Sequence, residues 1–250
     1  MKVRAELRTL AVLGVAIAGI GSRAEAGIVT VPSGLNSGDH YRLMFVTSTT
    51  TAATSSSIAY YNQFVADAAN SVQGLAALGI TWTAIASTDT TDAIANIGAD
   101  SGVPIYGLDG WIIASDATTA GPNTLFATTT NLFSVLFNDP IITEQGTFYG
   151  SRVWTGTNPQ GLRDSFLTLG HVGGLYPPRA GYAAAPGNNS ADVFQDDFGQ
   201  PASALLPLYA ISSELTYEAA PEPTSIALAA LGLALLLFAQ RASKRRNLVG

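Results

Sequence analysis

The order of apolar and polar side chains predicts short strands and one clear amphipathic helix. Residues 40–47, 80–86 and 208–212 are rich in aromatic and β-branched side chains, the composition typical of strands. Between the first two runs, Ser57 can cap a helix. The apolar positions of this helix recur in steps of three and four, as one helix face requires: Ile58, Tyr61, Val65, Ala68 and Val72.

Shorter apolar runs fill the middle of the chain. One of them, residues 90–98, predicts a short helix with Gly98 as its stop. Three others predict strands, because they are short, apolar and flanked by turn residues: 103–106, 111–114 and 152–155. The stretch 156–207 is rich in Gly, Pro, Asn and Asp, and a loop of this length is usually functional or mobile. Since no repeat is present, these elements predict a single α+β domain.

The first 26 residues have the pattern of a secretory signal peptide. Three basic residues come first: Lys2, Arg4 and Arg8. A short apolar stretch follows over residues 10–20, and Ala24 and Ala26 then flank Glu25 in the small-x-small arrangement of a signal-peptidase site. We expect cleavage after Ala26, so that the mature chain begins at Gly27.

The last thirty residues contain a second apolar run. Residues 226–239 carry no charge, and the wider segment 224–240 has seventeen residues, at the lower edge of what spans a bilayer. A basic cluster follows, which favours the cytoplasmic side: Arg241, Lys244, Arg245 and Arg246. We therefore expect a transmembrane helix over 224–240 with the body outside the cell. The alternative is a buried core helix.

Just before this run stands Pro221-Glu222-Pro223, which resists helix formation. The triplet, the apolar run and the basic end together resemble the PEP-CTERM sorting signal of Gram-negative bacteria, over residues 221–246. The resemblance implies recognition by an exosortase, a membrane protease, and an association with extracellular polysaccharide and biofilm. Signal peptidase and exosortase are thus the expected processing enzymes.

Between the two signals lies an acidic body, residues 27–220. It holds fifteen acidic residues against four arginines and no lysine, a formal net charge of −11. Such a surface repels nucleic acid and anionic lipid, and leaves neutral glycans, divalent cations or basic proteins as partners. The chain has no cysteine, which excludes disulfides, thiol catalysis and cysteine-ligated zinc.

Four motifs in this body carry a second resemblance. They are W-x-A-x-A-S-T from Trp82, V-P-I from Val103, V-W-T-G-T from Val153 and L-Y-A-I from Leu208. In this order they resemble the endostatin-like module of certain collagens, over about residues 80–217. The resemblance implies a C-type-lectin-like fold with a twisted antiparallel sheet, two helices and a long loop region. The module's cysteines, heparin-binding arginines and zinc ligands are not matched, nor are the calcium motifs of sugar-binding lectins.

Two places are candidate ligand sites. Trp111 follows a glycine between two short strands and is a possible exposed platform, whereas Trp82 and Trp154 are expected in the core. Three acids share the long loop with Asn188 and Asn189: Asp192, Asp196 and Asp197. Oxygen ligands in a loop suit calcium, and the alternative is a solvated acidic loop.

No catalytic motif selects an enzyme. The only histidines are His40 and His171, and neither G-x-S-x-G nor H-E-x-x-H occurs. We expect an exported, exosortase-processed surface or matrix protein, not an enzyme, with a structural, adhesive or binding role in exopolysaccharide. The alternatives are a secreted polysaccharide hydrolase and a calcium-dependent lectin.

Overall fold

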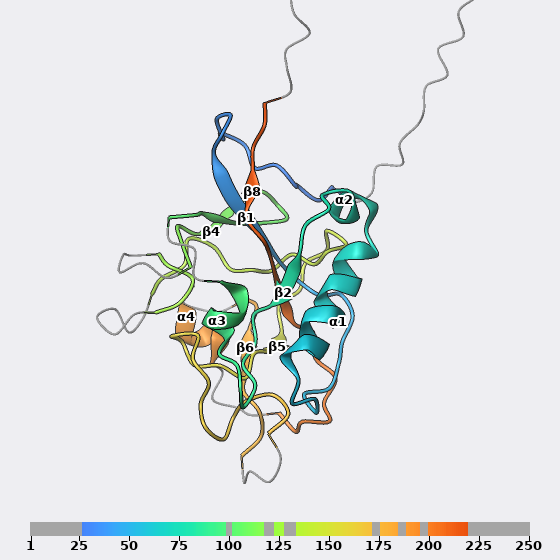
Figure 1. Cartoon of the computed structure of the whole chain (residues 1–250). Coiled ribbons are helices and arrows are strands. Elements are labelled where there is room, and N and C mark those ends of the chain that lie inside the picture. Colours follow the sequence, from blue (N-terminus) through green and yellow to red (C-terminus); the bar gives the residue numbers. More distant parts are fainter. Residues whose placement is uncertain are drawn as a thin grey trace, which may run out of the picture.

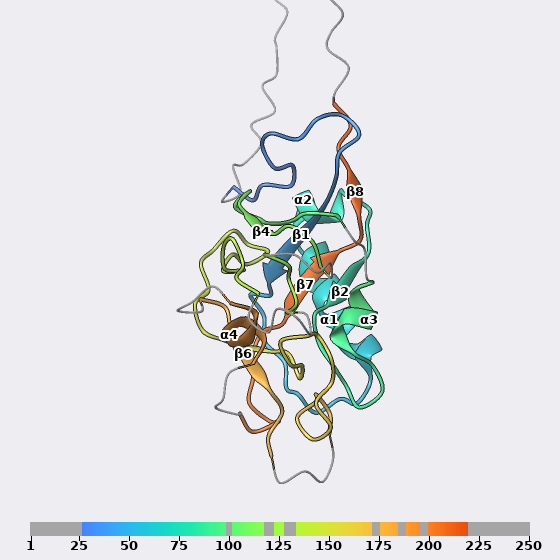
Figure 2. The same cartoon turned by 90° about the vertical axis from the view of Figure 1, so that its left-hand side faces the viewer.

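A computed structural model describes residues 27–98, 102–117, 123–127, 134–171, 176–184, 189–195 and 200–219. The described chain is α+β, with a mixed six-stranded sheet, a two-stranded sheet and four helices (Figures 1 and 2). The α+β class predicted from the sequence is therefore confirmed.

The larger sheet is built around β1 (His40–Val46), which pairs antiparallel with β7 (Tyr209–Ser212) and parallel with β3 (Ile105–Gly107). Beyond these lie the outer strands β2 (Trp82–Ala84) and β4 (Ile112–Ala114). All residues of β1 after His40 are buried, as is typical of a strand covered on both faces. This explains the nearly continuous apolar run in its sequence.

One face of this sheet is covered by α1 (Ile58–Asn70), which α2 (Gln73–Ala76) follows. Buried Tyr61 and Val65 of α1 belong to the same core cluster as Phe45 and Trp82, whose rings meet edge to face with centroids 5.0 Å apart. The expected core positions of Trp82 and Trp154 are confirmed, since both are buried.

The second core cluster, which takes Met44 and Val46 from β1, includes residues of α3 (Ala93–Ile97) and α4 (Ser190–Phe194). Nearby, β5 (Arg152–Trp154) and β6 (Ala180–Tyr182) form the small antiparallel sheet. A Cβ on Gly181 of β6 would lie 1.7 Å from the Val193 carbonyl oxygen, so only glycine lets α4 approach β6 this closely.

Two expectations about this architecture are wrong. The sheet is mixed rather than antiparallel, because β1 and β3 run parallel. The described chain has four helices rather than two, since α2 and α4 were not expected. These helices contain four and five residues, which is too short for a helical period to show in the sequence.

The expected transmembrane helix also needs correction. Among the described residues, no helix is long and apolar enough to cross a membrane. The longest, α1, has 13 residues, which at about 1.5 Å per residue is well short of a hydrocarbon core of about 30 Å. Residues 224–240 lie outside the described residues, as does the expected signal peptide over 1–26. The fold is therefore described without a membrane-spanning helix.

The first and last described segments lie together. The short strand β8 (Leu215–Thr216) pairs with the start of β1, and the Tyr217 amide donates to the Asp39 carbonyl over 2.8 Å. Figures 1 and 2 place β8 at one end of the molecule and the loops after β5 toward the other. The body thus has a terminal pole and an opposite, distal pole.

Candidate functional site

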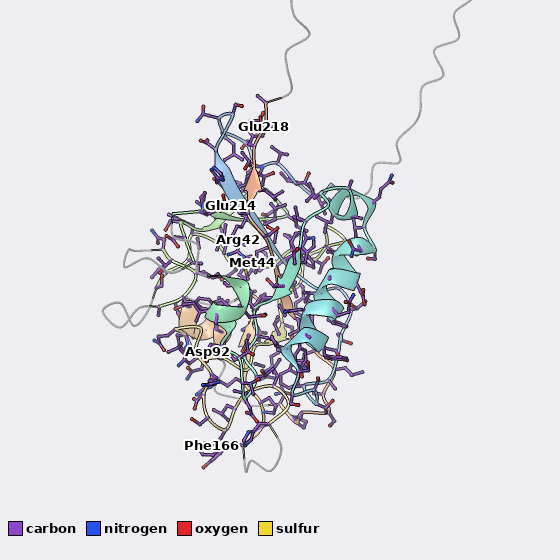
Figure 3. The ribbon with its side chains drawn as sticks, in the orientation of Figure 1. Arg42, Met44, Asp92, Phe166, Glu214 and Glu218 are labelled. Atoms are coloured by element: carbon purple, nitrogen blue, oxygen red, sulfur yellow. The ribbon has the colours of Figure 1, made fainter. Side chains whose placement is uncertain are left out.

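Two loops meet near the distal pole, one after β2 and one after β5. Their contacts bring together a set of polar and aromatic side chains that we call the distal cluster: Asp89, Arg163, Phe166, Thr168 and His171. Figure 3 shows Phe166 at one end of the molecule and Glu218 at the opposite end.

The backbone holds the second loop firmly. The Leu169 amide donates to the Ser87 carbonyl over 3.0 Å, and the Gly170 amide donates to the Ala53 carbonyl over 2.8 Å. Gly170 has a φ of +73°, and a Cβ there would lie 2.1 Å from the Ser55 carbonyl oxygen. Glycine is therefore required immediately before His171, and the close approach positions the imidazole.

The centre of the cluster is a His–Asp pair. His171 Nδ1 lies 3.0 and 3.1 Å from the two carboxylate oxygens of Asp89, and the Thr168 hydroxyl donates to the same carboxylate. Because an ionised carboxylate only accepts hydrogen bonds, we assign the proton of neutral His171 to Nδ1. Nε2 is then an acceptor, and it has no hydrogen-bond partner in the described part of the chain.

These contacts change the acidity of Asp89. The hydrogen bond from Thr168 lowers the pKa of Asp89 below its ordinary value, and the hydrogen bond from His171 adds to this effect. Partial desolvation acts in the opposite direction but is outweighed. The carboxylate is therefore ionised at neutral pH.

The arginines near the cluster are paired with acids. The Arg163 amide donates to the Asp92 carboxylate over 2.8 Å, and the guanidinium Nε of Arg163 lies 3.8 Å from the same carboxylate. The guanidinium also donates to the Asp89 backbone carbonyl over 3.1 Å. A bond of 2.6 Å joins Arg179 to Asp164. Two of the body's four arginines therefore lie here, each facing a carboxylate.

Exposed rings accompany these polar groups. Phe166 is 59% exposed and meets His171 edge to face, with ring centroids 5.9 Å apart. Tyr176 is 65% exposed. The distal cluster therefore presents an aromatic surface beside fixed donors and acceptors, which can bind a polar ligand that also has apolar faces.

The candidate residues from the sequence do not join this cluster. Trp111 is 66% exposed in the turn between β3 and β4, where its amide donates to the Asp109 carboxylate over 3.1 Å. Its role as a ligand platform stays a prediction.

Of the three acids in the acidic loop, the structure describes only Asp192, which lies in the first turn of α4. The Asp192 amide donates to the side-chain oxygen of the helix cap Asn189 over 2.9 Å, and Asn189 Nδ2 donates back to the Asp192 carboxylate over 2.8 Å. Asp192 therefore belongs to a reciprocal helix cap. Asp196 and Asp197 lie outside the described residues, and no group of three potential metal ligands occurs among those described.

The remaining sequence candidates also lie outside the described residues, except Gly27. They are Ala24, Ala26, Pro221, Glu222, Pro223, Arg241, Lys244, Arg245 and Arg246. The sequence reasoning missed the distal cluster because Asp89 and His171 are 82 residues apart and form no local motif.

Comparison with known proteins adds no assignment: no protein-family model matches the chain, and neither does any curated protein. The chemistry of the distal cluster therefore has to be argued from its own contacts.

Proposed function

We propose that the chain is an exported protein of the cell surface or extracellular matrix, with an adhesive or binding role in exopolysaccharide. The supporting observation is the separation of the two poles. The segment that leads to Pro221-Glu222-Pro223 leaves the body beside β8, whereas the exposed ring of Phe166 in the distal cluster lies at the other end. A body retained through its C-terminal segment would present this cluster outward.

The arrangement of the described body suits such a role. β1 runs through the centre of the sheet and joins the first and last segments by backbone hydrogen bonds, without any disulfide. The sorting signal over residues 221–246 is proposed to direct processing by an exosortase, after signal peptidase has removed residues 1–26.

The experiment replaces Pro221, Glu222 and Pro223 with alanine in the producing cell. Export should continue, but the chain should accumulate as an unprocessed precursor, because a processing enzyme would no longer find its extended motif. Fractionation and intact-mass measurement detect this. Glu218→Ala, just before the triplet, is the matched control and should be processed normally. Normal processing of the triple variant would overturn the sorting proposal.

A second candidate is a secreted polysaccharide hydrolase, which one observation favours. Nε2 of His171 is an acceptor on a residue oriented by Asp89, which is the arrangement of a general base acting on water. New reducing ends from exopolysaccharide, lost in His171→Gln, would favour the hydrolase. Their absence, with polysaccharide still bound, would favour the binding role.

A further inference from the structure

We infer that the distal cluster binds an uncharged glycan chain without a metal ion, with the ring of Phe166 as the stacking platform. This inference rests on the proposed function and names the partner of the same surface. It depends on the geometry of the rings, on the orientation of the polar groups beside them, and on the local charge.

The first step concerns the rings. Phe166 and Tyr176 lie on two segments that are held together, since the Arg179 amide donates to the Leu167 carbonyl over 2.7 Å and Arg179 pairs with Asp164. Both rings are more than half exposed. An exposed aromatic face attracts the C–H groups that line one side of a pyranose ring, because the face carries partial negative charge.

The second step concerns the polar groups. A sugar hydroxyl both donates and accepts hydrogen bonds, so it needs neighbours of fixed orientation. His171 is such a neighbour, because Asp89 holds Nδ1 and leaves Nε2 as an acceptor beside the Phe166 ring. Asp89 is held in turn by Thr168, so little side-chain freedom remains to be lost on binding.

The third step concerns charge. The body as a whole is strongly acidic, and Arg163 and Arg179 of this region each face an aspartate. Among the described residues of this region, no unpaired arginine therefore compensates the repulsion that a uronate or sulfate chain would meet. An uncharged glycan meets no such repulsion, and its apolar faces match the exposed rings.

The test is isothermal titration calorimetry of the full-length chain in the presence of a chelator. The probes are cello-, laminari- and manno-oligosaccharides, with an oligoguluronate as the acidic comparison. We expect at least one neutral series to bind and the guluronate to bind more weakly. Phe166→Ala should lower the affinity about tenfold, near the upper end of what one aromatic contact contributes.

Two variants serve as controls. Phe166→Tyr keeps an aromatic ring and should bind like the parent, and Trp111→Ala removes a similarly exposed ring elsewhere and should have no effect. Unchanged urea midpoints exclude misfolding. The inference would be overturned if no neutral probe binds, if Phe166→Ala binds as tightly as the parent, or if the guluronate binds more tightly than the neutral probes. None of these results bears on export or processing, so the sorting part of the proposed function is tested separately by the triple alanine variant.

Discussion

The Asp89 carboxylate joins two loops that are far apart in sequence. Its partners Thr168 and His171 lie 79 and 82 residues further along the chain. The charged groups that shift its pKa, His171 and Arg163, lie on the loop after β5. Asp89 is thus the residue whose ionisation most directly sets the geometry of the distal cluster.

This gives a pH-dependent prediction for stability. Because the folded state lowers the pKa of Asp89 below 3.8, its contribution is present above that pH and is lost as pH falls through the lower folded value. Asp89→Asn should therefore be less stable than the parent at pH 7, by no more than about 1 kcal/mol for such an exposed pair.

Urea unfolding at pH 7 and at pH 3 measures the effect. The difference between the parent and Asp89→Asn should shrink at the lower pH, where the parent carboxylate begins to take up a proton. A difference that stays constant or grows would show that ionisation of Asp89 contributes nothing.

Gly170 gives a second prediction, with Gly79 as its control. Both have positive φ, of +73° and +62°, so alanine should cost about 1–2 kcal/mol at either position for the backbone alone. Of these two positions, only Gly170 would place the new Cβ against another atom, the Ser55 carbonyl oxygen; at Gly79 nothing lies within 4 Å. Gly170→Ala should therefore lose about 1–3 kcal/mol more than Gly79→Ala in chemical denaturation. Equal losses would mean that the loop yields easily and does not position His171.

Among the elements, β2 shows how an outer strand is protected. Asn62 of α1 accepts from the Ala84 amide over 2.9 Å, and Asn96 of α3 donates to the Ala84 carbonyl over 2.7 Å. The two amide side chains also bond to each other over 2.9 and 2.8 Å. The amide and the carbonyl of Ala84, which could otherwise pair with a strand of another chain, are therefore already hydrogen-bonded.

This amide pair gives a prediction about cooperativity. Asn62→Ala and Asn96→Ala should each cost about 1–2 kcal/mol, because each leaves a partly buried backbone group of Ala84 unpaired. The double variant should cost less than the sum, since either change already breaks the shared bonds. Gln63→Ala, which loses only an exposed bond to Asp67, is the control and should change stability by less than about 0.5 kcal/mol. Strict additivity in the double-mutant cycle would contradict the coupling.

The sequence predicted those elements whose own pattern is long enough. α1 shows four buried positions over 13 residues, and β1 is buried on both faces, with Arg42 as the one charged residue among its buried positions. By contrast, β6 and β8 have three and two residues, and each forms only because a distant strand pairs with it. The same limit applies to the candidate site: Asp89 and His171 meet through loop packing around Gly170, which no local pattern reports.

At the scale of the whole molecule, the main feature is the opposition of the two poles. The C-terminal segment leaves beside β8, and the distal cluster with Phe166 lies at the other end. If the precursor is retained through its C-terminal segment, a probe from solution should reach the distal pole more easily than the terminal pole.

The absence of cysteine makes this testable, because one introduced thiol reports on one position. Ser165, beside Phe166, and Glu218, near β8, are both exposed. In cells that accumulate the Pro221–Glu222–Pro223 alanine variant, Ser165→Cys should react several-fold faster than Glu218→Cys with a bulky membrane-impermeant maleimide. The ratio of the two rates in the purified chain corrects for intrinsic reactivity. If the corrected rates are equal, or if Glu218→Cys is faster, the body is not held with its terminal pole toward the cell. Outward display of the distal cluster would then fail as an explanation of the exposed Phe166 ring.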